Sequence, residues 1–167
     1  LTAVTARIAA RLGIAAAILP MSDAPVRTRV ETAEGILDFQ DYFVRRRCEV
    51  RITGLRFDGA REAHASEPVV RALDAARTVI FCPSNPFVSI DPILAVGGIR
   101  ARIEKSLAPR IAVSPIIGGK AVKGPAAKMM AELGYAVSSL SVARRYLGLI
   151  DGFVIDNADA HLARDIE

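Results

Sequence analysis

The sequence predicts an α/β fold of the Rossmann-like type, with a mostly parallel sheet, helices on both faces and a small β-hairpin insertion. Two observations predict it: short apolar segments alternate with helical segments, and polar loops follow three of the apolar segments. Parallel strands need long connections, and these connections form right-handed crossovers. Ligands of such sheets bind beyond the carboxyl ends of the strands, so the pattern predicts a binding site at the polar loops.

Length and composition restrict the class of protein. The chain of 167 residues has the size of one domain, and we expect residues 1–167 to form a single α/β domain. Hydrophobic residues make up 51% of the chain without a continuous apolar run that could cross a bilayer, so no membrane association is expected. Two cysteines without CxxC spacing argue against a zinc site and favour a cytoplasmic protein. A net charge of +4 with only 5% aromatic residues disfavours nucleic-acid binding relative to a phosphorylated small molecule.

The first half of the chain predicts a helix, a strand and then a hairpin. Residues 1–12 place apolar side chains at helical spacing and end at Gly13, and the apolar run 14–19 predicts a strand. Residues 26–32 and 35–39 alternate across a turn, which predicts a hairpin. The segments that follow predict a short helix at 41–48, a strand at 49–57, and a helix at 67–76 with Ser66 as N-cap.

The second half predicts buried strands alternating with helices. The strands are expected at 78–82, 110–113 and 152–155. The helices are expected at 93–107 with a weak point at Gly97 and Gly98, from 124 to 133, at 138–147, and from 159 onward. This order makes every strand the start of a crossover unit and places a loop at each carboxyl end.

Residues 110–130 carry the strongest signal for a binding site. An apolar strand enters a loop in which Gly118 and Gly119 free the backbone for close approach to a ligand. Lys120 and Lys123 supply positive charge in the same loop, and the helix expected after it would turn its free amides toward the loop. These features together favour binding of a phosphate or diphosphate.

Two observations limit that interpretation. Ala121 follows Lys120 where a Walker loop has Ser or Thr, so no hydroxyl is placed for magnesium in the Walker manner. A solvated glycine turn with two unrelated lysines explains the same residues, and for this segment alone both interpretations stay open.

Polar residues also follow the other predicted strands. Met21, Ser22 and Asp23 come after the first apolar run, and Ser84 and Asn85 come after the next buried strand. Local turns would use the same residue types, because Ser, Asn and Asp hydrogen-bond to nearby backbone amides. A third polar group after the last strand, residues 156–159, could contact a metal or guanine, but a helix cap explains it better.

Four motifs together resemble the 2-phospholactate transferase family. They are LPMSDAPVRT (19–28), FQDYFVRRR (39–47), PSNPFVSIDPILAV (83–96) and SPIIGGKAVKGPAAKMM (114–130). The resemblance covers nearly the whole chain. Family members are longer, so it implies that this chain is the central and later part of such an enzyme. The missing parts would then be an N-terminal strand with a glycine-rich loop, aspartates implicated in magnesium binding, and the C-terminal end.

The resemblance implies a magnesium-dependent transferase, expected to form a homodimer. Such an enzyme moves a 2-phospholactyl or phosphoenolpyruvyl group from a guanosine diphosphate-linked donor to the ribityl hydroxyl of the deazaflavin Fo, and releases GMP. The metal ligands are expected from the missing N-terminal region. Carried onto this sequence, the nucleotide and its phosphates are assigned to Ser84, Asn85, Ser114, Gly118, Gly119, Lys120 and Lys123. The deazaflavin side is assigned to Met21, Ser22, Asp23, Arg27 and Thr28, with Asp23 as the catalytic residue that orients or deprotonates the hydroxyl.

An alternative is a non-enzymatic protein of the same fold that binds a nucleotide sugar and acts in regulation. The loops of such proteins lack the GGKAVKGP sequence found here at 118–125. Lys120 and Lys123 are therefore the residues that separate the two hypotheses.

Overall fold

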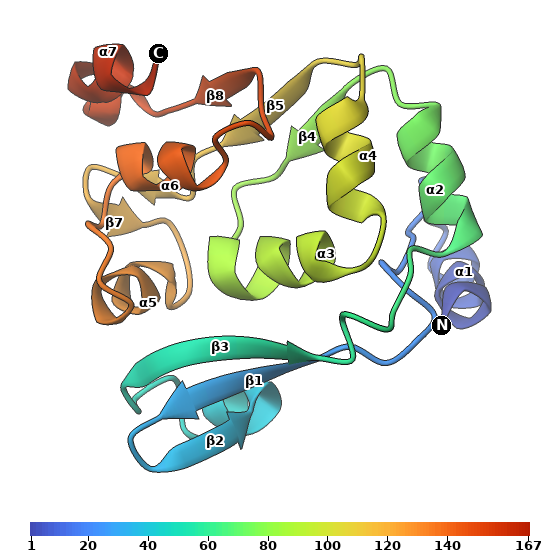
Figure 1. Cartoon of the computed structure of the whole chain (residues 1–167), viewed down its shortest axis with the longest axis horizontal. Helices are drawn as coiled ribbons and strands as arrows, with labels where there is room; N and C mark the ends of the chain where they lie inside the picture. Colours follow the sequence, from blue (N-terminus) through green and yellow to red (C-terminus); the bar gives the residue numbers. More distant parts are fainter.

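The computed structural model of the chain describes residues 1–167 and contains three sheets (Figure 1). The central sheet is parallel and has the order β4-β5-β8, with β4 at Val79–Phe81, β5 at Arg110–Val113 and β8 at Gly152–Val154. The α/β class, the mostly parallel sheet and the added hairpin are thereby confirmed.

Helical segments connect the three parallel strands. The segments from β4 to β5 are η2 (Pro86–Ile90), α3 (Asp91–Ala95) and α4 (Ile99–Lys105), and those from β5 to β8 include α5 (Ala126–Glu132) and α6 (Ser139–Arg145). The predicted weak point at Gly97 and Gly98 is the place where α3 ends and α4 begins. After β8 the chain forms η3 (Asn157–Leu162) and α7 (Ala163–Ile166).

The order of the strands decides which face of the sheet is covered. The order advances in one direction from β4 to β8, so right-handed crossovers place both connections on the same face. On that face Phe81 and Ala112 are paired in register and only 6% and 0% exposed. Side chains alternate between faces, and on the other face Ile80 and Val154 are 61% and 50% exposed. The connections of this chain therefore cover one face, where the sequence predicted helices on both.

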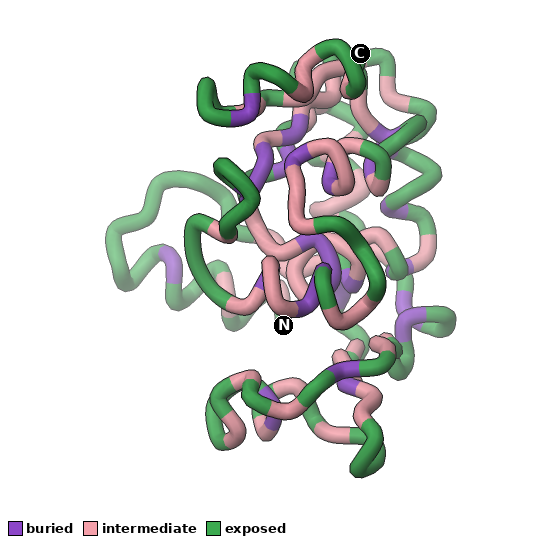
Figure 2. The backbone as a smooth tube through the Cα atoms, turned by 90° about the vertical axis from the view of Figure 1, so that its left-hand side faces the viewer, coloured by how far each residue is buried: buried purple, intermediate pink, exposed green.

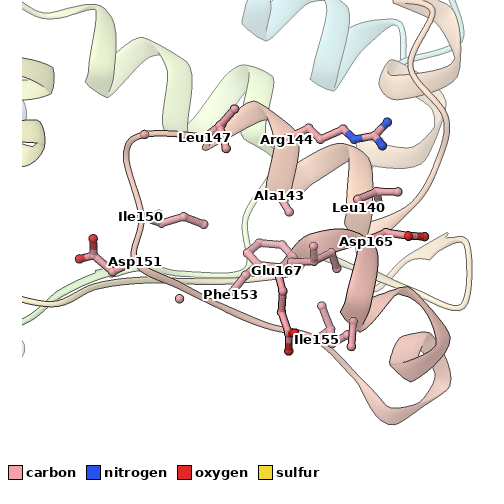
Figure 3. A pocket seen from close by; sticks show the side chains of 14 residues that line it. Leu140, Ala143, Arg144, Leu147, Ile150, Asp151, Phe153, Ile155, Asp165 and Glu167 are labelled. Carbon is pink, nitrogen blue, oxygen red and sulfur yellow. The ribbon is translucent and has the colours of Figure 1, made fainter.

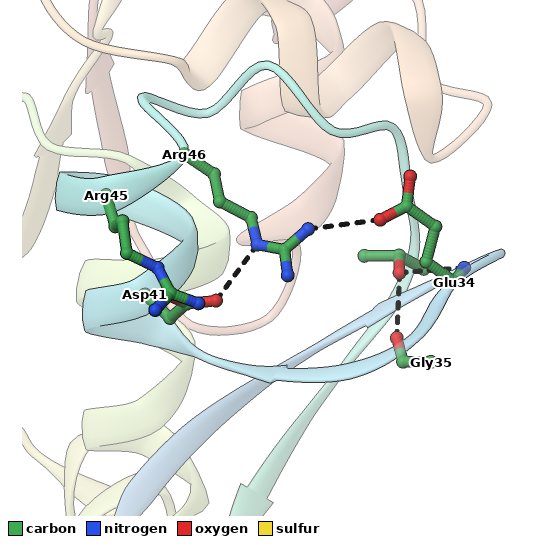
Figure 4. Close-up of polar contacts among 6 residues, drawn as sticks. Glu34, Gly35, Asp41, Arg45 and Arg46 are labelled. Carbon is green, nitrogen blue, oxygen red and sulfur yellow. Dashed lines mark hydrogen bonds and ion pairs between the residues drawn. The ribbon is translucent and has the colours of Figure 1, made fainter.

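The predicted hairpin belongs to a second, antiparallel sheet. Strands β1 (Arg27–Thr32), β2 (Gly35–Asp38) and β3 (Ile52–Asp58) form it in the order β2-β1-β3. The π-helical turn η1 (Asp41–Arg45) follows β2. Arg46 donates to Asp41 and to Glu34, each at 3.0 Å, and so fastens η1 to the hairpin turn (Figure 4). The core includes residues of both this sheet and the parallel one, and Figure 2 shows the buried segments toward the middle of the molecule.

The N-terminal segment departs from the prediction. Helix α1 (Thr2–Arg11) forms as expected, and Gly13 has the positive φ of +67° that suits the turn after a helix. The strand predicted at 14–19 is wrong, because these residues pair with no other strand and Ile14 and Ile18 are 40% and 48% exposed. The apolar stripe of α1 is also exposed; its members are Leu1, Val4, Ile8 and Leu12.

Helix α2 (Glu67–Asp74) begins at the predicted place. Ser66 precedes it in an extended conformation, but its hydroxyl makes no capping hydrogen bond and is buried without a partner. Ser66 is therefore the N-cap residue, as predicted, but its side chain does not make the hydrogen bond that such a residue usually makes.

Arg110 links the amino ends of β5 and β8 through hydrogen bonds. The backbone N–H and the Nε of Arg110 on β5 each lie 2.9 Å from one carboxylate oxygen of Asp151, just before β8. The same guanidinium donates to the carbonyls of Ile103 and Glu104 in α4, at 3.3 and 3.2 Å. The hydrogen bonds that the side chain and the backbone N–H of Arg110 donate to the Asp151 carboxylate lower the pKa of Asp151.

We expect Asp151→Asn to destabilise the chain at pH 7 and to have a smaller effect at pH 3. The pKa of Asp151 is lower in the folded state, so its stabilisation is complete above the unfolded-state pKa of about 3.9 and is lost as the pH falls through the folded value. Urea unfolding of both chains at the two pH values measures this. Asp165→Asn, at an exposed carboxylate of α7, is the matched control, and an equal effect of both substitutions would contradict the assignment.

Candidate functional site

The carboxyl edge of the parallel sheet gathers two of the three predicted loops. Ser84 and Asn85 follow β4, and Ser114 follows β5, whose neighbours run in the same direction. The backbone N–H of Ser114 donates to the carbonyl of Val154 at 2.9 Å and so extends the β5–β8 pairing by one residue. Asp156, after β8, belongs to the same edge. The edge is the candidate site, as parallel strand order requires.

Asn85 holds the loop after β4 in place. Its side-chain oxygen accepts a hydrogen bond from the N–H of Phe87 at 3.0 Å and caps η2. Its side-chain nitrogen lies 3.2 Å from the sulfur of Met129 in α5. Asn85 therefore joins the loop after β4 to the helix that follows the glycine loop, and Ser84 beside it is half-buried.

The glycine loop is a β-hairpin in the structure. Ser114 is 5% exposed, and its hydroxyl accepts from the N–H of Ile116 at 3.1 Å and donates to the carbonyl of the same residue at 2.8 Å. Strands β6 (Ile116–Ile117) and β7 (Lys120–Ala121) then pair across Gly118 and Gly119. The two glycines have φ of +54° and +74°, as a two-residue hairpin turn requires.

This hairpin corrects the expected connection to the next helix. The sequence predicted a loop that runs directly into a helix with Pro125 as its first residue. The structure ends the hairpin at Ala121 and begins α5 at Ala126, with Pro125 as its N-cap. The helix start is therefore separated from the glycines by β7 and the residues after it.

A buried carboxylate anchors the hairpin turn. The N–H of Gly118 lies 3.2 Å from each carboxylate oxygen of Asp159 in η3, and Asp159 is 2% exposed. A Cβ on Gly118 would meet Ala158 at 3.9 Å, and one on Gly119 would meet the carbonyl of Val137 at 3.7 Å. The turn thus sits between η3 and the segment before α6, and the amide of Gly118 is already used.

Sequence reasoning missed this contact, because 41 residues separate Asp159 from Gly118. The neighbouring Asp156 does behave as predicted, since its carboxylate accepts from the N–H of Ala158 at 2.9 Å and caps η3.

Two lysines, called here the hairpin lysines, lie on the hairpin and just after it: Lys120 on β7 and Lys123 two residues beyond Ala121. Lys120 and Lys123 are exposed and form no ion pair. By contrast Lys128 in α5 lies 2.6 Å from Glu132 and donates to the carbonyl of Val50 at 3.0 Å. The carboxyl edge therefore presents two positive charges that have no carboxylate partner in this chain.

The residues assigned to the deazaflavin lie elsewhere. Ser22 is 4% exposed and accepts from the N–H of Ala24 at 3.1 Å, and Met21 is half-buried beside it. The carboxylate of Asp23 accepts from the backbone N–H of Thr2 at 2.6 Å and lies 2.8 Å from the amino group of Leu1. Figure 1 places this end of the chain on the opposite side of the molecule from β7 and α5.

The carboxylate of Asp23 accepts hydrogen bonds from both the backbone N–H and the hydroxyl of Thr2, at 2.6 and 3.0 Å. Arg27 and Thr28 begin β1 and pair in register with Asp58 and Phe57 of β3. The structure therefore joins Met21–Asp23 to the start of α1 and to the antiparallel sheet, and does not gather them with the other two loops.

The described residues do not form a metal site among themselves. No three His, Cys, Asp or Glu side chains come together in a way that could hold a metal ion. The residues of this chain therefore do not by themselves fit a magnesium ion. None of the helices is long and apolar enough to cross a bilayer.

A cavity of about 630 Å³ lies apart from the predicted residues, between α6, β8 and α7 (Figure 3). Its lining is mainly apolar and includes Leu140, Phe153 and Ile155, and no predicted site residue contributes to it. The charged residues of its lining are three carboxylates, Asp151, Asp165 and Glu167, and one guanidinium, Arg144, a balance that disfavours a phosphorylated ligand. The carboxyl edge is therefore the better candidate.

The parallel strand order, with polar loops at the carboxyl edge of the sheet, defines a Rossmann-like α/β protein. The sequence matches the family described as 2-phospho-L-lactate transferase CofD over residues 1–166, and the chain belongs to this family.

Individual relatives agree with the family. The chain is 43% identical over 159 residues to a 2-phospho-L-lactate transferase of Methanosarcina mazei, covering 95% of this chain and 52% of the relative. It is 38% identical over 172 residues to a phosphoenolpyruvate transferase of Streptomyces griseus, covering 100% of this chain and 54% of the relative. The chain thus spans about half the length of these curated relatives.

The fold is also similar to that of a solved structure. A crystal structure of a Bacillus halodurans protein superposes with a TM-score of 0.59 at 16% identity, covering 96% of this chain and 51% of that chain. At this identity the similarity supports the fold and nothing finer.

We expect Asp159→Ala to destabilise the chain by about 1–3 kcal/mol, because it leaves the N–H of Gly118 without its acceptor. Asp159→Asn keeps an acceptor oxygen and should cost less. Urea unfolding measures the stability, and hydrogen exchange at Gly118 reports the turn itself. Asp165→Ala is the exposed control, and unchanged exchange at Gly118 in Asp159→Ala would contradict the anchoring role.

Proposed function

We propose that this chain is part of a transferase that moves a 2-phospholactyl or phosphoenolpyruvyl group from a guanosine diphosphate-linked donor to the ribityl hydroxyl of the deazaflavin Fo. The observation that carries the proposal is the family match over residues 1–166. Relatives named for each donor match at similar identity, 43% and 38%, so the proposal includes both donors.

The proposed reaction is attack of the ribityl hydroxyl oxygen on the phosphorus atom next to the lactyl or enolpyruvyl group. A new P–O bond forms to the deazaflavin, the P–O bond to the bridging oxygen of the diphosphate breaks, and GMP leaves. The hydroxyl proton is released in the same step. Such a transfer depends on in-line positioning and on neutralising the charge of the diphosphate.

We assign the diphosphate to Lys120 and Lys123. Support comes from their exposure and from the absence of ion pairs with carboxylates of this chain. A positive charge beside each phosphate stabilises the negative charge that grows on the leaving GMP. Three other residues of the nucleotide side shape the edge through their own hydrogen bonds: Asn85, Ser114 and Gly118. Ser84 and Gly119 lie beside them in the same loops.

We assign the acceptor side to residues 21–28, with Asp23 as the group that orients the hydroxyl. The Asp23 carboxylate already accepts two hydrogen bonds from Thr2, which fits a role in orienting a hydroxyl by accepting its hydrogen bond. Magnesium dependence and a homodimer are further expectations from the family resemblance. No observation on this chain favours the alternative of a non-enzymatic nucleotide-sugar-binding protein.

We expect Lys120→Ala combined with Lys123→Ala to weaken the binding of GDP by about 10-fold or more, because charge-assisted contacts to the diphosphate are lost. Titration calorimetry with GDP measures the affinity. Lys105→Ala, at an exposed lysine of α4, removes a similar charge elsewhere and should change little. Unchanged affinity in the double variant would remove the lysines from the nucleotide site.

We expect Asp23→Asn, in the complete gene product, to reduce turnover more than it reduces GDP binding. The reason is that Asp23 acts on the acceptor and not on the nucleotide. Release of GMP in the presence of Fo and each donor measures turnover. Wild-type rates in Asp23→Asn would exclude Asp23 from the reaction, and GDP binding without GMP release in the unaltered protein would favour the non-enzymatic alternative.

A further inference from the structure

A basic cleft lies between the α3–α4 connection and α6, and neither Lys120 nor Lys123 lines it. It has a volume of about 590 Å³, within the range of about 300–1,000 Å³ typical of small-molecule sites. Three arginines line it, Arg100 from α4 and Arg144 and Arg145 from α6. The lining also includes Tyr135, from the segment between α5 and α6, and one carboxylate, Asp91.

The charges of the cleft do not balance. Asp91 is already paired with Arg145. Arg100 lies 2.9 Å from Glu104 one turn along α4, but both side chains are about half exposed, at 50% and 44%, so the pair is weakly held. Arg144 is exposed and forms no ion pair. The lining therefore carries a surplus of positive charge.

Arg145 is held rigidly in the wall of the cleft. Its guanidinium lies 4.5 Å from the ring centre of Phe87 and 5.6 Å from that of Tyr135. It also donates to the hydroxyl of Tyr135 at 3.3 Å and pairs with Asp91. Its buried Nε has no hydrogen-bond partner. A positive charge fixed by an ion pair and two aromatic rings loses little freedom when an anion approaches.

Arg144 supplies a second cation that can move toward a ligand. Figure 3 shows its guanidinium pointing away from the apolar side chains around Phe153, on the other side of α6. The ring of Tyr135, which is 43% exposed, and Leu94 add apolar surface to the cleft. The cleft thus combines guanidinium groups with a small apolar wall.

We propose that this cleft binds a small phosphorylated molecule that carries at least two negative charges. Guanidinium groups bind phosphate oxygens through paired hydrogen bonds. The cleft has three guanidinium groups and only one carboxylate, so its lining favours such an anion. None of the cleft residues belongs to the nucleotide or deazaflavin assignments, so the site is additional to the proposed transferase site.

Inorganic pyrophosphate is the probe, and calorimetry is the measurement. The titrations use the Lys120→Ala, Lys123→Ala variant, so that binding at the hairpin cannot supply the signal. We expect pyrophosphate to bind this variant, and we expect the further changes Arg100→Gln and Arg144→Gln to weaken that binding at least about 10-fold. Both arginines are exposed, and circular dichroism checks that the fold is kept.

The matched control removes the same charge elsewhere. Arg71 on α2 pairs with Glu67 four residues away, as Arg100 pairs with Glu104, and Arg164 on α7 is exposed as Arg144 is. Arg71→Gln with Arg164→Gln should leave the affinity within about 2-fold, since distant surface charges are screened by salt. An equal loss of pyrophosphate affinity from the Arg100 and Arg144 changes and from the Arg71 and Arg164 changes would show a general effect of charge. That result would overturn the proposed site in the cleft.

If pyrophosphate does not bind the Lys120→Ala, Lys123→Ala variant, the proposed site in the cleft is also overturned. That outcome would leave the proposed function untouched, because the proposed function is tested separately by GDP affinity and GMP release.

Discussion

The direction of the parallel strands is the constraint on which the rest of the structure depends. The order β4-β5-β8 advances one way, so right-handed crossovers place the connecting helices on one face. The same direction brings the loops after all three strands to one edge. One topological fact therefore decides where the core forms, which face stays open at Ile80 and Val154, and where polar residues far apart in the sequence meet.

Most of the polar residues at that edge hold the loops in shape. Ser114 bonds within its own turn, Asn85 caps η2 and reaches Met129, and Asp159 holds the amide of Gly118. The buried polar groups are thereby satisfied, which keeps the edge rigid. The groups left for a ligand are the exposed ones, above all the hairpin lysines. The buried polar residues therefore build the edge, and the exposed ones can contact a ligand.

Sequence reasoning predicted what local patterns determine. The α/β class, the first hairpin and most helix and strand positions follow from periodicity and turn residues. The strand at 14–19 failed because an apolar run becomes a strand only if a partner pairs with it, and the run itself does not show the partner. The β6–β7 hairpin was missed, although Gly118 and Gly119 between short paired segments are a signal for a two-residue turn. The contact between Asp159 and Gly118 has no local signal at all.

The two halves of the proposed transferase site rest on different kinds of support. Transfer of a phosphoryl-linked group requires the acceptor hydroxyl and the donor phosphorus to lie about 3 Å apart in line. Lys120 lies on the hairpin at the carboxyl edge, whereas Asp23 is held at the start of α1 on the opposite side of the molecule. The geometry of this chain supports the nucleotide side, and the family resemblance alone supports the acceptor side. Because the chain spans about half the length of its curated relatives, the proposed activity belongs to the whole protein. The tests therefore treat nucleotide affinity and acceptor turnover as separate quantities, since either can fail without the other.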